Sequence, residues 1–346
     1  MRTGLKFIPN NYVLEENQEP GIKTKNIFLI TRFFPNLDSC LLVLESFKNM
    51  KKFISAFALT LIFLSPICLK AQQGDLRQQV TDIIKPAKGI VGVSLLGLES
   101  RDTLSANGDA RLVLHSVMKF PIALTILHMV DSGVFKLDQK VHFKKRDMAT
   151  KLYSPLRDKF PNGDVDVTIA DLLGYMVSQS DNVACDMLLK KIDGPKPVQD
   201  YMLHLGIRGI AIRASEEDMA SAWELQYTNW AKPKEMTILL DKFYKGEILS
   251  KTSTDFLYKI MVETTTGPKR LKGLLPANMV VAHKTGTSPT NSAGLSPATN
   301  DVGIITLPNG KHLAIAVFVC NSTDKEDVRE GIIAKIAKAA VDFYGK

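Results

Sequence analysis

The sequence is poor in cysteine and has no cluster of residues spaced for metal binding. Four cysteines occur in 346 residues, and none belongs to a Cys-x-x-Cys pair or a Cys–His pattern of the kind that holds zinc. Cys185 and Cys320 both stand among apolar residues, which favours two buried free thiols. A disulfide between them is the alternative in an oxidising compartment. No metal ion and no organic cofactor is expected.

The sequence also lacks a strong charge of one sign and an apolar run long enough to span a membrane. It has 44 Lys and Arg against 36 Asp and Glu, and because the basic residues are dispersed, nucleic-acid binding is disfavoured. The apolar run Phe53–Cys68 has 16 residues, whereas a spanning helix needs about 20. The run follows Met50-Lys51-Lys52 and is succeeded by the small residue Ala71, which is the pattern of a cleaved signal peptide.

These segments predict the organisation of the chain. Residues 50–71 are expected to be a signal peptide cleaved near Ala71, and the mature protein, 72–346, is expected to be secreted or periplasmic with no stable membrane association. A membrane anchor is the alternative. Residues 1–49 precede a complete signal, so they are expected to be a non-native upstream extension, with a genuine N-terminal extension as the alternative.

Strand patterns lie at both ends of the mature chain and helical patterns lie in the middle. Val/Ile/Leu-rich segments predict strands at 89–98, 104–114, 280–283, 302–307 and 312–319. Helical periodicity predicts helices at 75–85, 116–131, 168–177, 183–192, 234–244 and 327–344. The simplest arrangement is an α+β fold with an antiparallel sheet built from both termini, flanking helices and an inserted all-helical lobe. The expected sheet lobe is 72–114 with 262–346, and the expected helical lobe is 115–261.

Ser116-x-x-Lys119 places a hydroxyl and an amine on one helical face. Residues three apart on a helix are neighbours, and Ser116 is expected at a helix N-terminus, where the dipole favours developing negative charge. Lys119 could accept the serine proton or hold a charge beside it. Taken alone, the pattern is more often an ordinary N-cap serine followed by an exposed lysine.

Two further strings add polar groups at separations of 64 and then 104 residues. In Ser180-Asp181-Asn182, a hydroxyl could relay a proton and an amide could bind a substrate carbonyl, although such a string also suits a plain turn. Lys284-Thr285-Gly286 ends a predicted strand, with a cation, a hydroxyl and a residue that permits close backbone approach. The backbone N–H groups of Thr287 and Ser116 would form a two-donor oxyanion hole.

Together, and in this order, the three strings resemble the motifs of the penicilloyl-serine enzymes, and the size, export signal and element order resemble class A serine β-lactamases within them. The resemblance covers the mature chain. It implies a β-lactamase/transpeptidase-like fold, a monomeric enzyme and a small-molecule β-lactam substrate. Ser116 would be the nucleophile, with Lys119 and Ser180 as proton carriers. Asn182, Lys284, Thr285, Gly286 and Thr287 would bind substrate.

The resemblance also implies a glutamate about 34 residues after Asn182 that activates the deacylating water. That count reaches Glu216, within an irregular segment spanning 212–233 of a length that is usually functional. Whether Lys119 or Glu216 is the acylation base stays open on these grounds. Glu217 and Asp218 are acidic neighbours, so the count rests on the spacing alone.

Several positions depart from the commonest class A pattern. Glu217 replaces a proline, Ala220 replaces an asparagine that helps to hold the water, and Ala214 replaces an arginine that pins the loop. Val302 stands where many relatives carry an arginine beside the substrate carboxylate. Tyr153 matches an aromatic residue that lines the substrate cleft.

Met219 and the segment Gln226-Tyr227-Thr228-Asn229-Trp230 resemble the PER-like subgroup, which implies an expanded site and a preference for cephalosporins. Two other functions share the three motifs. A DD-peptidase or penicillin-binding protein would lack a deacylating glutamate at this spacing, and a β-lactam sensor would be acylated without turnover.

Overall fold

A five-stranded antiparallel sheet forms the framework of the part of the chain that the computed structural model describes, residues 75–148 and 151–346. The strand order is β2-β1-β10-β9-β8. The strands are β1 (Ile90–Gly97), β2 (Thr103–Ala106), β8 (Val281–Thr287), β9 (Ser296–Thr306) and β10 (His312–Ser322). Strands from the two ends of this part of the chain therefore pair directly, because β1 lies beside β10.

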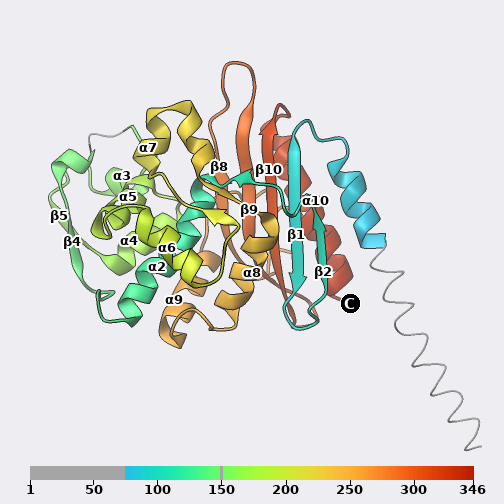
Figure 1. The fold of residues 1–346 in the computed structure, drawn as a ribbon, viewed down its shortest axis with the longest axis horizontal. Helices are drawn as coiled ribbons and strands as arrows, with labels where there is room; N and C mark the ends of the chain where they lie inside the picture. Colours follow the sequence, from blue (N-terminus) through green and yellow to red (C-terminus); the bar gives the residue numbers. More distant parts are fainter. Residues whose placement is uncertain (1–74, 149–150) are drawn as a thin grey trace, which may run out of the picture. The chain divides into compact units, whose positions relative to one another are not determined.

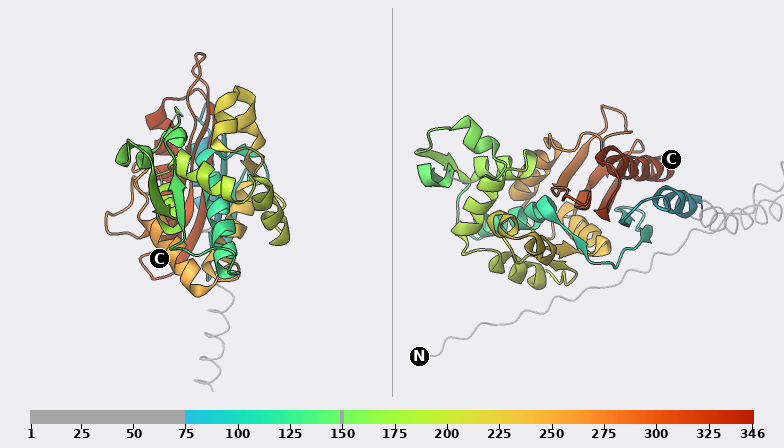
Figure 2. Two further views of the ribbon diagram at one scale, coloured as in Figure 1. Left: turned by 90° about the vertical axis from the view of Figure 1, so that its left-hand side faces the viewer. Right: turned by 90° about the horizontal axis from the view of Figure 1, so that it is seen from above.

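Both faces of this sheet are covered by helices, so β9 and β10 are buried along nearly their whole length. The closing helix α10 (Glu326–Tyr344) and the helical residues 75–84 lie on one side (Figures 1 and 2). Their apolar residues join those of the sheet in one cluster that includes Leu76, Ile315 and Ile333. Helix α8 (Pro233–Tyr244) packs against β1 and β10.

The chain between β2 and β8 is mainly helical and forms the left-hand part of Figure 1. Its longer helices are α2 (Lys119–Asp131), α4 (Ile169–Ser178), α5 (Asn182–Lys191), α6 (Lys196–His204), α8 and α9 (Lys251–Val262). Its short helices are η1 (His115–Met118), η2 (Lys145–Met148), α3 (Pro155–Lys159), α7 (Glu216–Ser221) and η3 (Trp223–Thr228). Its short strands are β3 (Leu112–Val113), β4 (Lys140–Phe143), β5 (Val165–Thr168), β6 (Ile210–Ala211) and β7 (Trp230–Ala231).

Helix α2 is the central helix of this region. Every residue from Lys119 to Leu127 is buried, because helices α4, α5, α6 and α9 all contact it. A helix surrounded in this way needs apolar residues on all sides rather than on one stripe. Lys119 at the first position of α2 is an exception, because it is a charged residue that is buried. Its partners lie in the candidate active site.

The sequence-based prediction of the elements is largely confirmed. A side-chain cap begins α4, since the Thr168 side chain accepts a hydrogen bond from Asp171 N. As predicted, Cys185 and Cys320 are buried free thiols. The predicted strand 104–114 instead divides into β2 and β3, which belong to different sheets. The division occurs at Asn107, whose φ of 50° turns the chain.

Two predicted boundaries near the motifs were wrong. Strand β8 continues to Thr287, so Lys284-Thr285-Gly286 lies within the strand and not at its end. Ser116 lies in the 3₁₀ turn η1, one turn before α2 begins. The predicted signal peptide and upstream extension lie outside the described residues.

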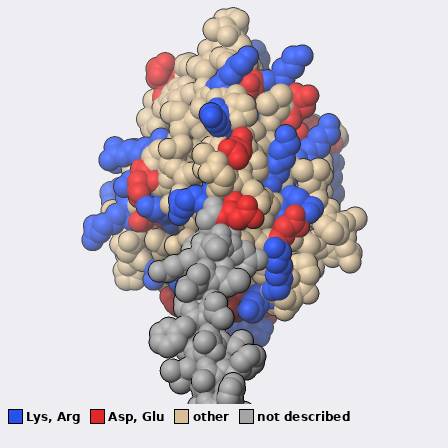
Figure 3. Space-filling view, turned by 90° about the vertical axis from the view of Figure 1, so that its right-hand side faces the viewer, with Lys and Arg blue, Asp and Glu red and all other residues tan. Residues whose placement is uncertain are grey.

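Charges of both signs are intermingled on the face that carries α10 (Figure 3). No helix among the described residues is long and apolar enough to cross a membrane.

The packing of α8 into the interior can be tested by truncating Phe243. Its side chain is fully buried and meets Phe120 edge to face, with ring centroids 5.5 Å apart. Truncation leaves a cavity, so Phe243→Ala should lower the free energy of unfolding in urea by about 3–5 kcal/mol. Ile238→Ala, on the same helix but 42% exposed, should change it by no more than about 0.5 kcal/mol. Equal losses in the two variants would contradict this packing.

Candidate active site

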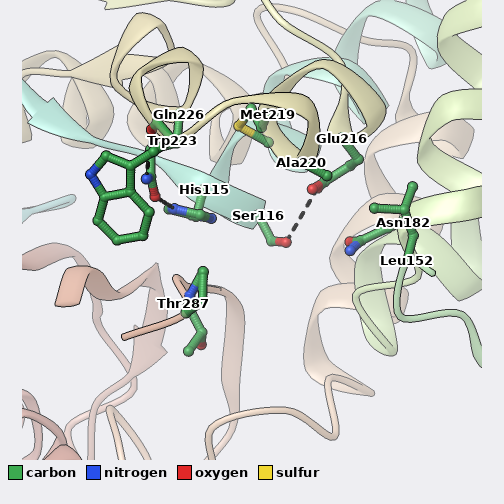
Figure 4. A pocket seen from close by; sticks show the side chains of 11 residues that line it. His115, Ser116, Leu152, Asn182, Glu216, Met219, Ala220, Trp223, Gln226 and Thr287 are labelled. Carbon is green, nitrogen blue, oxygen red and sulfur yellow. Dashed lines mark hydrogen bonds between the residues drawn. The ribbon is translucent and has the colours of Figure 1, made fainter. Parts of the chain in front are cut away.

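The Ser116 hydroxyl lies between an amine and a carboxylate. Lys119 Nζ donates to Ser116 Oγ at 2.8 Å, and Ser116 Oγ donates to Glu216 Oε1 at 3.4 Å (Figure 4). The i, i+3 relation across the junction of η1 and α2 brings the two side chains of the first motif together. The preceding residue, His115, has a φ of 46°, a strained value for a non-glycine residue.

Lys119 is the centre of the site. Its side chain is fully buried, and besides Ser116 its Nζ lies 2.5 Å from Asn182 Oδ1, 3.0 Å from Ser180 O and 2.8 Å from Glu216 Oε1. Because an ammonium has three N–H donors, four oxygens around it share them. This arrangement holds Ser116, the second motif and Glu216 around one atom.

The side chains of the second motif, Ser180-Asp181-Asn182, have different roles. Ser180 has a φ of 60°, which turns the chain sharply before α5. Asp181 is fully buried and accepts hydrogen bonds from Ala184 N, Leu156 N and Ser154 Oγ. It therefore caps α5 and ties α3 to it. The middle residue of the motif is structural, and its neighbours face the reacting groups.

Lys284 links the third motif to the second. Its Nζ donates to Ser180 Oγ at 3.0 Å and to Thr285 O at 3.0 Å. Burial lowers the pKa of Lys284 well below its usual range, and the nearby charge of Lys119 lowers it further. Because Ser180 Oγ accepts from Lys284, its own proton is available to a third group.

Gly286 lets β8 touch the nucleophile turn. A Cβ at this position would lie 2.4 Å from Leu114 O and 3.2 Å from Val117 N, which no side chain could tolerate. The close approach places Thr287 beside η1. It supports the predicted pairing of the backbone N–H groups of Ser116 and Thr287 as an oxyanion hole.

Arg270, which the sequence reasoning missed, supplies a cation beside the third motif. Its guanidinium donates to Thr287 Oγ1 at 2.8 Å and to Gly286 O at 3.1 Å, and Glu330 pairs with it at 3.1 Å. Val302 on β9, where relatives carry an arginine, is buried opposite Lys284. The positive charge therefore comes from the segment before β8 and not from β9. No spacing in the sequence predicts the role of Arg270.

Glu216 begins the short helix α7 and is 6% exposed. A reciprocal pair, Ser215 and Asp218, caps this helix. Asp186 on α5 accepts from Glu216 N and Glu217 N, each at 2.9 Å. Asp186 is four residues after Asn182 and so shares its helix face, which is the signal that could have revealed it.

Asn229 closes the irregular segment that carries Glu216. Its fully buried amide accepts from Arg213 N and Ala214 N and donates to Ala214 O at 2.8 Å. This hydrogen bonding occurs at Ala214, where relatives carry the pinning arginine. A buried amide therefore holds this part of the segment.

A cavity of about 290 Å³ opens at Ser116. It is lined by His115, Ser116, Leu152, Asn182, Glu216, Met219, Ala220, Trp223, Gln226, Thr287 and Pro289 (Figure 4). Tyr153 is 57% exposed, and its neighbour Leu152 provides the lining instead. Among the described residues, no group of three or more His, Cys, Asp or Glu is placed to hold a metal ion.

Comparison with known proteins agrees with this geometry. A sequence profile of the β-lactamase enzyme family matches residues 75–344. The chain belongs to this family. β-Lactamase VEB-1 of Pseudomonas aeruginosa is 44% identical over 285 residues, covering 82% of this β-lactamase and 95% of that protein. The extended-spectrum β-lactamase PER-1 of Pseudomonas aeruginosa is 40% identical over 294 residues, covering 85% and 95%.

Solved structures confirm the β-lactamase fold. The crystal structure of TLA-1 extended-spectrum β-lactamase matches with a TM-score of 0.77 and 48% identity, covering 79% of this chain and 99% of that one. A β-lactamase from Chitinophaga pinensis matches with a TM-score of 0.76 and 48% identity, covering 78% and 98%. These relatives confirm the predicted class A assignment and its PER-like character.

Asp186 predicts a pH-dependent stability. Burial raises the pKa of Asp186 from 3.8 to about 6, so the folded β-lactamase holds this proton more strongly than the unfolded chain. The stabilisation is full below pH 3.8 and is lost as the pH rises through about 6. Relative to Asp186→Asn, the wild type should therefore lose roughly 2.5 kcal/mol between pH 4 and pH 7.5.

Urea unfolding of both proteins across this pH range measures the difference. The amide of the variant also disturbs the contacts to Glu216 N and Glu217 N, but that penalty is independent of pH. A difference in stability that stays constant from pH 4 to pH 7.5 would contradict the assignment.

Proposed function

We propose that this enzyme hydrolyses the β-lactam amide of penicillins and cephalosporins through an acyl-enzyme on Ser116. The observation that carries the proposal is the single hydroxyl held between Lys119 Nζ at 2.8 Å and Glu216 Oε1 at 3.4 Å. One partner can take the serine proton and the other can later activate water. The names of PER-1 and TLA-1 describe extended-spectrum enzymes, which supports including cephalosporins.

In the acylation step, Ser116 Oγ bonds to the lactam carbonyl carbon and the C–N bond of the ring breaks. The Ser116 proton passes to Glu216, or to Lys119 once Lys119 has given a proton to Glu216, with which it is paired at 2.8 Å. Ser180 gives its proton to the departing ring nitrogen, and the proton taken from Ser116 then restores the Ser180 hydroxyl. The backbone N–H groups of Ser116 and Thr287 would hold the oxyanion. Asn182 is proposed to bind the side-chain amide of the substrate.

The substrate carboxylate is assigned to the third motif. Lys284, Thr285 and Thr287 present a cation and two hydroxyls, and Thr266 fixes the hydroxyl of Thr285 at 2.6 Å. Arg270 adds a second cation through Thr287. Charge-assisted hydrogen bonds of this kind are stronger than neutral ones, so they would anchor one end of the substrate. Tyr153 stays proposed as a residue at the outer edge of the cleft.

In the deacylation step, a water oxygen bonds to the acyl carbon and the bond to Ser116 Oγ breaks. Glu216 takes one proton from the water and passes it to Ser116 Oγ as the ester bond breaks, so both groups return to their starting state. The fixed position of Glu216 disfavours the DD-peptidase and sensor alternatives, because in both of these classes the β-lactam acyl group would remain bound to the serine. We further propose export through the segment 50–71 and a monomeric state.

Glu216→Gln should separate the two steps. The amide cannot accept a proton, so acylation should persist at least in part while turnover of nitrocefin falls about 10³-fold. Mass spectrometry should show a stable adduct on Ser116 with the full mass of the antibiotic, and Ser116→Ala should show none. Glu217→Gln is the matched control, because Glu217 is exposed and pairs only with Lys190 at 3.7 Å.

Normal turnover by Glu216→Gln would show that another group delivers the water. A single burst without turnover in the wild type would favour the peptidase or sensor.

A further inference from the structure

One wall of the cavity is an aromatic ring that the reaction does not use. Trp223 lies in η3, beyond the helix that carries Glu216, and it lines the cavity at Ser116. In Figure 4 its ring lies on the same side of Ser116 as His115 and Gln226, whereas Glu216 and Asn182 lie on the other. Leu152, Met219 and Pro289 complete the apolar part of the lining.

Two hydrogen bonds connect the backbone of Trp223 to the nucleophile turn. Gln226 Nε2 donates to Trp223 O at 2.7 Å, which fixes the orientation of the amide. Gln226 Oε1 therefore faces His115 Nε2, 2.8 Å away, and that nitrogen must be the donor. Gln226 is 3% exposed and His115 is 8% exposed, so water competes little for either bond.

The backbone of η3 is anchored from a second side. Tyr227 OH donates to Asn321 Oδ1 at 3.1 Å, at the end of β10. Glu216 is anchored by a different residue, Asp186 on α5. The Trp223 wall and the carboxylate that serves deacylation therefore have different anchoring side chains.

The chemistry of the substrate decides what would meet this wall. In a β-lactam, the carboxylate is attached on the nitrogen side of the ring carbonyl, and the acylamino side chain is attached on the opposite carbon. With the carboxylate at Lys284 and Thr285 and the carbonyl at Ser116, the side chain must extend away from Lys284 and Thr285, neither of which lines the cavity. Asn182, proposed above to bind the amide next to the ring, and Trp223 both line the cavity, so the group beyond that amide would share this space with the Trp223 ring.

We propose that Trp223 is a specificity-determining platform for planar aryl or heteroaryl side chains of β-lactams, and that its backbone is held in place by the relay from His115 through Gln226. The proposal rests on the β-lactamase function proposed above. Stacked or edge-to-face ring pairs contribute modestly but specifically beyond the area they bury. Trp223 therefore acts on substrate choice, and Gln226 and His115 act as positioning residues.

The test compares benzylpenicillin, which carries a phenylacetyl group, with 6-aminopenicillanic acid, which has the same nucleus and no acyl group. The selectivity is the ratio of the two kcat/KM values. Trp223→Ala should lower this ratio about five- to ten-fold, and Trp223→Phe should restore most of it. Leu225→Ala, on the same segment and outside the cavity lining, should leave the ratio within about two-fold.

The relay is tested by Gln226→Glu, which keeps an acceptor for His115 but loses the donor to Trp223 O. This variant should lower the same ratio about two- to five-fold, and combining it with Trp223→Ala should add nothing further. Independent additive losses would overturn the relay.

A spectroscopic readout avoids dependence on rates. The chain has two tryptophans, and Trp230 packs under Arg111, with the guanidinium 4.5 Å from the ring centroid. In a Trp230→Phe, Glu216→Gln background, acylation by benzylpenicillin should change the emission of Trp223, and acylation by 6-aminopenicillanic acid should not. Equal changes with both substrates, or an unchanged selectivity ratio in Trp223→Ala, would overturn the platform. Failure of the wild type to hydrolyse either compound would instead overturn the proposed function.

Discussion

The site depends on one buried ammonium. Lys119 Nζ is shielded from water and surrounded by oxygens from η1, the turn before α5, α5 itself and α7. A buried charge is tolerated only when it is paired and hydrogen-bonded, so these four segments are held at the distances that the lysine requires. The carboxylate of Glu216 is the charge that balances it. The same contacts that make the ammonium tolerable therefore position the nucleophile and the group that activates water.

The residues proposed to take part in the reaction could be predicted from the sequence. The residues that hold them in place largely could not. Ser116 and Lys119 are three apart on one helical path, and strand and helix periodicity predicted the order of the elements. Arg270 and Asn229 reach the site only through tertiary packing, so no local pattern identifies them. A turn at Asn107-Gly108 within 104–114 was predicted from the sequence, and Asn107 does turn the chain. The assignment of the two halves to different sheets was missed, because it depends on long-range strand pairing.

The segment between β6 and α8 contains only the short elements α7, η3 and β7, yet its backbone is held in place. Side chains from outside or at its end satisfy its backbone: Asp186 at Glu216 and Glu217, and Asn229 at Arg213 and Ala214. Each is a buried polar group whose hydrogen bonds are worth most where water is excluded. At Ala214 the backbone is held by the neutral amide of Asn229, and beside Val302 the positive charge comes from Arg270, so groups from other segments serve the two positions that depart from the class A pattern.

The position of β10 bears on how the chain reaches its native state. This strand is at the centre of the sheet, between β1 and β9, and its pairing with β1 joins residues more than 200 positions apart in the sequence. Contacts of such long range close large loops and form late. A nascent chain that ends before His312 has no central strand on which to assemble the framework, so synthesis is nearly complete before the sheet can form.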